Sequence, residues 1–164
     1  MKKLFIAIIA VVFMGTLIVA QAQQDESPEA ALLKMFTRTG GMGGVTLNFV
    51  LLNNKTVDLL FTAPGKYAIR ATANQATTFY VHGSTDKNLK VDNSFVIEQG
   101  ESTINAISHN IKNFDGNMVP SGQSISGLLQ CEEKIDLSQP FKIKGRNASI
   151  DFKLSPDALE RINN

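Results

Sequence analysis

The stretch from residue 45 to residue 82 decides the predicted fold. It reads VTLNFVLL at 45–52, TVDLLFT at 56–62, KYAIRAT at 66–72 and TTFYVH at 77–82. Apolar residues recur at every second position of each run, which is the spacing of a strand with one buried face. We therefore predict four consecutive strands, whose inward-facing residues are Val45, Leu47, Phe49 and Leu51, then Val57, Leu59 and Phe61, then Tyr67, Ile69 and Ala71, and finally Phe79 and Val81.

Residues typical of turns separate the four runs. Asn53-Asn54 predicts a hairpin turn, because Asn tolerates the left-handed backbone of tight turns better than most residues. Pro64-Gly65 predicts a type II turn, since Pro presets the angle of the second turn residue and Gly accepts a positive angle at the third. Strands joined in this way pair antiparallel.

Further strands follow in the second half of the chain. Period-two patterns predict them at 94–98, 123–131, 141–144 and 149–154. The segment 102–114 reads as either helix or strand, because its apolar residues recur at helical spacing while its asparagines and isoleucines are poor helix formers. We favour strand and loop for this segment.

A helix is predicted at each end of the domain. Ser27-Pro28-Glu29 has a capping residue, a proline suited to the first helical position and an acid that complements the helix dipole. This first helix is expected to end at Gly40-Gly41, where glycines up to Gly44 would form a flexible hinge. A similar opening at 155–158 predicts a short C-terminal helix. The fold class is thus mainly β, an antiparallel β-sandwich or half-open barrel with one N-terminal and one short C-terminal helix.

Residues 1–22 have the pattern of a cleaved secretory signal peptide. Lys2 and Lys3 precede an apolar run, and Ala20-Gln21-Ala22 offers small residues for cleavage after Ala22. The alternative is an uncleaved membrane anchor, since the apolar run is only slightly shorter than a membrane span. We expect a periplasmic or secreted protein with no membrane span after cleavage.

Removing residues 1–22 from the 164-residue chain leaves 142 residues and changes the net charge from +1 to −1, because Lys2 and Lys3 are lost. A chain of this length predicts a single domain, residues 23–164. No clustered basic face appears, so nucleic acid is not an expected partner. The lone Cys131 cannot form an internal disulfide, and it is expected on the inward face of its strand with Ile125, Gly127 and Leu129.

Residues that could carry catalysis are few. The two histidines, His82 and His109, have no other ligand-type residue at a spacing typical of zinc sites. Gly122 to Gly127 misses the Gly-x-Ser-x-Gly pattern of a nucleophile turn by one residue. We therefore predict no catalytic residues, no metal and no cofactor, with a hydrolase around His82 or His109 kept as an alternative.

An excess of aliphatic residues is the more informative feature. Val50, Leu52 and Leu60 fall on the face opposite the main buried set, so both faces of the predicted hairpin are partly apolar. Either a second layer of structure covers this face, or a half-open sheet holds an apolar ligand there with the N-terminal helix as a lid. In the second case the predicted ligand contacts are Leu32, Met35, Phe36, Val50, Leu52 and Leu60.

The order of these segments resembles that of bacterial periplasmic lipoprotein carriers. EAALLKMF at 29–36, a glycine break and GVTLNFVL at 44–51 carry the resemblance, which covers roughly residues 29–81. It implies a half-barrel sheet that holds acyl chains under helices. The chain differs from such carriers in having no Trp, and the part after residue 100 has no counterpart in them.

The function expected from the sequence is non-enzymatic binding in the bacterial cell envelope. The partner would be an apolar small molecule, such as a lipid or a lipoprotein acyl chain, or another envelope protein. An alternative is a structural or adhesive module that assembles through sheet edges. The sequence fixes no oligomeric state.

Overall fold

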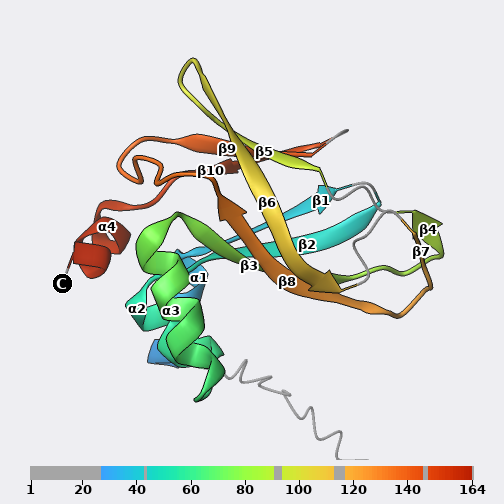
Figure 1. Cartoon of the computed structure of the whole chain (residues 1–164), viewed down its shortest axis with the longest axis horizontal. Coiled ribbons are helices and arrows are strands. Elements are labelled where there is room, and N and C mark those ends of the chain that lie inside the picture. Colours follow the sequence, from blue (N-terminus) through green and yellow to red (C-terminus); the bar gives the residue numbers. More distant parts are fainter. Residues whose placement is uncertain (1–26, 43, 91–93, 113–116, 146–147, 164) are drawn as a thin grey trace, which may run out of the picture.

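The fold is described from a computed structural model of the chain, which defines residues 27–42, 44–90, 94–112, 117–145 and 148–163 (Figure 1). The predicted signal peptide lies outside these described residues. The elements in chain order are α1 (Pro28–Met35), β1 (Thr37–Met42), β2 (Val45–Leu51), α2 (Asn54–Leu60), α3 (Gly65–Gln75), β3 (Thr78–Ser84), β4 (Leu89–Lys90), β5 (Phe95–Gln99), β6 (Ser102–Lys112), β7 (Met118–Val119), β8 (Ser124–Cys131), β9 (Phe141–Lys144), β10 (Ser149–Phe152) and α4 (Pro156–Asn163).

Eight of the strands form one antiparallel sheet that curls into a nearly closed barrel. Their order is β1-β2-β3-β8-β6-β5-β9-β10, and strands β4 and β7 pair separately as a small second sheet. The four helices gather at one end of the barrel, and β4 and β7 lie at the opposite end (Figure 1). The predicted fold class, a mainly β half-open barrel with N-terminal and C-terminal helices, is confirmed.

The barrel interior is a packed apolar core. Alternate residues of β2 face inward, as the period-two pattern predicts, and the same holds for β3, β5, β8, β9 and β10. The largest fully buried side chains of this core are Phe36, Phe49, Phe79, Phe152, Leu47, Leu51, Ile97, Ile125, Leu129, Ile143 and Val81. Because large aromatic and aliphatic side chains meet inside the barrel, they occupy the space that a ligand would need there.

Side chains close the seam between the first and the last strand. Strands β1 and β10 lie side by side, but hydrogen bonds of the sheet ladder do not join them within the described residues. The guanidinium of Arg38 in β1 donates to the carbonyl oxygen of Lys153 and lies 5.1 Å from the ring centre of Phe152. The same group donates to the carbonyl of Thr37 at 2.7 Å. The contacts of Arg38 with Lys153 and Phe152 bind the two edges together without a continuous ladder.

The predicted strand at 56–62 is wrong, because residues 54–60 form helix α2. Asn53 is the N-cap of this helix and not part of a hairpin turn: its Oδ1 accepts from the backbone N–H groups of Lys55 and Thr56. The hydroxyl of Thr56 accepts in turn from the backbone N–H of Asn53 at 2.9 Å. This reciprocal capping box starts a helix where the sequence analysis expected a turn.

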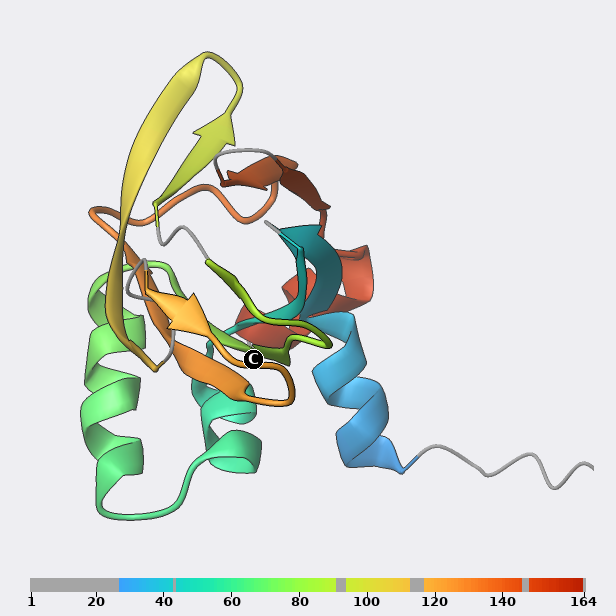
Figure 2. The same ribbon diagram turned by 90° about the vertical axis from the view of Figure 1, so that its right-hand side faces the viewer.

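The predicted strand at 66–72 is also wrong, because residues 65–75 form helix α3. Gly65 begins this helix, so Pro64-Gly65 does not form the predicted type II turn between strands. Tyr67, expected inward, is 62% exposed, and none of the eleven residues of α3 is fully buried. Together α2 and α3 form a helical hairpin that protrudes beside the barrel (Figure 2).

The end of the first helix also differs from the prediction. Helix α1 ends at Met35, and Gly40 and Gly41 lie within β1 instead of capping the helix. The predicted hinge at these two glycines is therefore a strand. The ambiguous segment 102–114 contains the long strand β6, as we favoured, and helix α4 follows the Ser155-Pro156 opening as predicted.

Candidate functional site

The helical hairpin covers part of the outer face of the barrel. Val50 in β2 and Leu52 just after it are 3% and 5% exposed, although neither belongs to the core cluster inside the barrel. Val57 in α2 is fully buried, and the ring of Phe61 meets the ring of Tyr80 edge-on, with centres 5.3 Å apart. A second layer of helices thus covers the apolar second face at this end, which was one of the two arrangements expected from the sequence.

The six predicted ligand contacts do not converge on one cavity. Phe36 is fully buried in the barrel core, and Leu32 and Met35 pack against that core. Val50 is buried on the outer face, while Leu60 is half-buried on α2. Of these six residues, only Leu52 lines a cavity with apolar walls within the described part of the chain.

This cavity lies between the barrel and the helices and has a volume of about 180 Å³. Four segments that are distant in sequence build it: the β2–α2 junction, the end of α3, the loop after β8 and the last turn of α4. Its lining residues are Leu51, Leu52, Asn53, Asn54, Ala73, Asn74, Thr77, Lys134, Ile135, Leu137 and Ile162. Six of these residues are apolar, and none is acidic. We call this space the helix-end cavity.

The polar side chains that line the helix-end cavity belong to three asparagines, Thr77 and Lys134. The Oδ1 atom of Asn53 accepts from the N–H groups of Lys55 at 2.9 Å and Thr56 at 3.0 Å, which fixes the orientation of the amide. Its Nδ2 group is therefore the free end; it is buried and has no hydrogen-bond partner among the described residues. Such a buried unpaired donor costs about 1–3 kcal/mol. Because the nitrogen has almost no accessible surface, a water-sized group in the cavity does not contact it.

Two further donors belong to the same wall. The hydroxyl of Thr77 accepts from the backbone N–H of Ile135 at 3.0 Å, so its own proton is available to an acceptor. Lys134 lines the cavity as an exposed side chain, and no ion pair of Lys134 occurs within the described part of the chain. The wall of the helix-end cavity thus combines six apolar side chains with a small number of polar ones, as is common in small-molecule sites.

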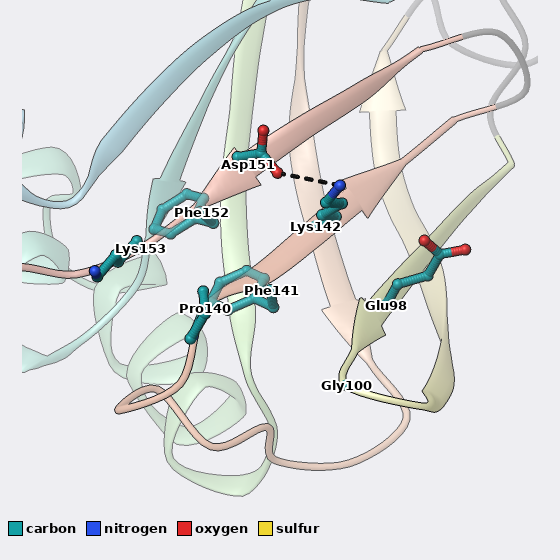
Figure 3. A pocket seen from close by; sticks show the side chains of 8 residues that line it. All are labelled: Glu98, Gly100, Pro140, Phe141, Lys142, Asp151, Phe152 and Lys153. Atoms are coloured by element: carbon teal, nitrogen blue, oxygen red, sulfur yellow. Dashed lines mark ion pairs between the residues drawn. The ribbon is translucent and has the colours of Figure 1, made fainter.

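A larger hollow of about 510 Å³ lies over β5, β9 and β10 (Figure 3). Three of its four charged lining side chains are paired: Lys142 lies 3.6 Å from Asp151, and Glu98 lies 2.6 Å from Lys144, which stands outside the lining. Lys153 is the fourth, and no ion pair of Lys153 occurs among the described residues. The rings of Phe141 and Phe152 stack beneath it, with centres 4.9 Å apart. Because most of its charged groups already have partners and are well exposed to solvent, we interpret this hollow as a solvated sheet face.

His82 lies half-buried on the outer face of β3. Its ring stacks on Tyr80 with centres 5.4 Å apart, and burial lowers the pKa of His82 below its usual value. The sheet register places it between Asn48 and Ser126. A catalytic histidine is usually oriented by a carboxylate that accepts one of its N–H groups. Within the described ranges, no carboxylate bonds to His82.

The other candidate residues are less informative. The backbone of His109 pairs with that of Leu128, while its side chain lies outside the described residues. Cys131 is buried on the inward face of β8 with Ile125 and Leu129, as predicted, and burial raises the pKa of its thiol to about 12. The described residues contain no group of three His, Cys, Asp or Glu side chains that could hold a metal ion.

Comparisons with known proteins found no match: no family model, no curated protein and no solved structure is similar to this chain. None of the helices within the described ranges is long and apolar enough to cross a membrane. The sequence analysis missed Asn53 and Thr77 as cavity residues because it placed both in or beside strands. An Asn followed three residues later by Thr was the available signal, since that spacing permits a capping box.

Proposed function

We propose that this protein is a non-enzymatic binding protein, exported to the periplasm or the cell exterior, that holds a small apolar ligand in the helix-end cavity. Support for binding comes from the cavity itself, where Leu52, Ile135 and Ile162 provide apolar walls between the barrel and the helices. The signal-like residues 1–22 support export.

The packing of the barrel favours this site over the barrel interior. Large aromatic side chains such as Phe49 and Phe79 fill the interior, whereas the cavity remains open between barrel and helices. The contacts across the seam also disfavour assembly through sheet edges, because β1 and β10 face each other with Arg38 bound to Lys153.

A cavity-filling variant tests the proposal. Leu52 is a poor target, since a polar residue at a position 5% exposed would destabilise the fold. Ala73 is better: it lines the cavity from α3, so the longer side chain of Ala73→Met would occupy the ligand space while methionine still favours a helix. Ala71→Met places the same side chain on an exposed position of the same helix and serves as the control.

The measurement is native mass spectrometry of protein purified from the periplasm, followed by solvent extraction of bound molecules. We expect a ligand mass of small-molecule size on the wild-type protein and on Ala71→Met, and its loss from Ala73→Met. Retention of the same mass by Ala73→Met would show that the ligand binds elsewhere. Protein without ligand in all three samples would contradict the proposal, provided that added aliphatic compounds also fail to bind.

A further inference from the structure

We infer that the tip of the α2–α3 hairpin binds the surface of an anionic lipid bilayer. The tip is defined as residues 59–67, which comprise the end of α2, the connection between the two helices and the start of α3. This inference goes beyond the proposed function, because it concerns a second site and a different kind of partner.

The tip exposes apolar side chains that the fold does not cover. Tyr67 is 62% exposed and Leu59 is 38% exposed, and they are two of the four large apolar side chains that are exposed among the described residues. Between them, Ala63 and Pro64 are exposed and Phe61 is half-buried. Such a patch suits the interfacial region of a bilayer, where a tyrosine places its ring among acyl chains and its hydroxyl among head groups.

The backbone of the tip is folded into a compact turn. The N–H of Lys66 donates to the carbonyl oxygen of Thr62 at 3.1 Å, and the N–H of Tyr67 donates to the carbonyl oxygen of Pro64 at 3.2 Å. The ammonium group of Lys66 also pairs with Asp58 at 3.1 Å. Polar groups that are bonded within the protein lose less when water is removed, so this turn can approach lipid head groups at low cost.

The charge of the hairpin favours an anionic surface. Residues 53–75 contain three basic side chains, Lys55, Lys66 and Arg70, and one acid, Asp58, which gives a net charge of +2. The rest of residues 23–164 contains eleven bases and fourteen acids, which gives a net charge of −3. An anionic surface therefore attracts the hairpin and repels the rest of the domain, and this orients the tip toward the lipid.

The chain before α1 directs the same end of the domain toward a bilayer. The apolar run at 4–19 is expected to enter the membrane, either as a signal peptide before cleavage or as an anchor. Seven residues, 20–26, separate this run from Ser27, and seven residues span at most about 25 Å. The start of α1 and the connection between α2 and α3 lie at the same lower end of the molecule in Figures 1 and 2. This short tether favours a bilayer over a protein partner at the tip.

The absence of tryptophan from the chain permits a direct test. Tyr67→Trp introduces a single indole at the tip, and Met118→Trp introduces one in β7, at the opposite end of the barrel (Figure 1). Both positions are 62% exposed, so each indole starts in water and the two variants form a matched pair. Trp is close to Tyr in helix propensity and is common in strands, so both variants should fold, and thermal unfolding checks this.

The measurement is the fluorescence of each variant, purified after export, during titration with vesicles of phosphatidylcholine that contain about one-third phosphatidylglycerol. We expect the emission of Tyr67→Trp to move to shorter wavelength in a saturable way and to be protected from quenching by acrylamide. The emission of Met118→Trp should stay unchanged. Vesicles of pure phosphatidylcholine should bind about tenfold more weakly, because the net positive charge of the hairpin then gains no attraction.

A second substitution measures the apolar part of the contact. Leu59→Gln in the Tyr67→Trp background should weaken vesicle binding about three- to tenfold, because one apolar side chain no longer leaves water. Glutamine still favours a helix, so α2 should persist. Ile107→Gln in the same background removes an apolar side chain of β6 that is 49% exposed, and it should leave vesicle binding unchanged.

The mass of the purified protein shows whether residues 1–22 remain, since a retained apolar run would itself bind vesicles. The two reporters still compare the two ends of the barrel in that case, and equal shifts of Tyr67→Trp and Met118→Trp would overturn the inference. So would an unchanged emission of Tyr67→Trp with anionic vesicles. A shift of Tyr67→Trp that depends on protein concentration but not on vesicles would assign the tip to contacts between copies of the chain and would also overturn it. None of these outcomes depends on a ligand in the helix-end cavity, so the inference and the proposed function can fail separately.

Discussion

The side chain of Ile150 in β10 fills the space beside Gly40 in β1 that a larger residue at position 40 would need. A Cβ atom added to Gly40 would overlap the Cγ1 and Cδ1 atoms of Ile150. At the neighbouring Gly41, the nearest atom to an added Cβ is the carbonyl oxygen of Val45, 4.0 Å away. Two adjacent glycines of one strand therefore differ in their tolerance of a side chain.

Gly40→Ala should lower the free energy of unfolding by about 1–3 kcal/mol, as overpacking does in well-packed cores. Gly41→Ala should change it by no more than about 0.5 kcal/mol. Urea denaturation of the two variants and the wild type measures both values. Replacing Ile150 by Val in the Gly40→Ala background should recover part of the loss. Equal effects at the two glycines would contradict the close packing of the seam.

The capping box of α2 predicts a specific cost for Thr56→Val. The hydroxyl of Thr56 is fully buried, accepts from the N–H of Asn53 and donates to the carbonyl of Leu51 at 3.0 Å. Valine keeps the shape but leaves both backbone groups without a partner, so we expect a loss of about 1–3 kcal/mol in the free energy of unfolding. Thr72→Val on α3, where the hydroxyl is exposed, should cost under about 0.5 kcal/mol. Similar losses for the two variants would argue against the capping box.

Cys131 predicts a loss of stability at alkaline pH. Burial raises the pKa of its thiol to about 12, whereas an unfolded thiol titrates near about 8.5. Because the folded state holds its proton more tightly, this contribution to stability is complete below about pH 8.5 and is lost as the pH rises toward 12. The loss reaches about 1.4 kcal/mol per pH unit within that window.

Urea denaturation of the wild type and Cys131→Ala at pH 7, 8 and 10 measures this contribution. The difference in stability between the two proteins should be constant from pH 7 to pH 8, and it should move in favour of the variant at pH 10. A thiol-specific reagent should modify Cys131 of the wild type only under unfolding conditions. Rapid modification of the folded protein at pH 8 would contradict the assigned burial.

Asp58 joins the two helices of the hairpin and predicts an acid-sensitive contact. Lys66 donates to its carboxylate at 3.1 Å, and Arg70 bonds to the same oxygen; together they hold the pKa of Asp58 below its usual value. A lowered pKa means that the contact stabilises the hairpin above the usual aspartate value of about 3.9 and is lost as the pH falls below it.

An NMR titration of the Asp58 carboxyl group checks this prediction. Its midpoint should lie below the usual aspartate value of about 3.9, and Lys66→Met should raise the midpoint of Asp58. A midpoint of Asp58 that does not respond to Lys66→Met would show that Lys66 is not its main partner.

The sequence predicted most of the barrel because its strands bury one face. Strands β2, β3, β5, β8, β9 and β10 follow the period-two pattern, which depends only on which side chains point inward. The helical hairpin of α2 and α3 could not be predicted in this way. In 56–62 the residues Val57 and Leu60 also fit helical spacing, and the structure exposes Leu59, which the strand pattern placed inside.

The candidate site was harder to predict than the fold. Its walls come from positions near 52, 73, 135 and 162, and a cavity between such distant segments depends on strand order and helix docking, which local patterns do not encode. Leu52 was predicted as a ligand contact because it lies opposite the buried face of its strand. Asn53 was assigned to a turn, so its role as the N-cap of α2 and the burial of its amide nitrogen could not be predicted.

The seam also determines when the fold can be completed. Arg38 and Lys153 are separated by 115 positions in the chain, and their contact joins the first strand to a residue just after the last one. A growing chain therefore cannot close its barrel until residues 149–153 have been synthesised, and a chain truncated before β10 would leave the edges of β1 and β9 exposed. Such fragments could pair with other chains through these edges, so β10 and the contact of Lys153 with Arg38 protect the barrel against aggregation.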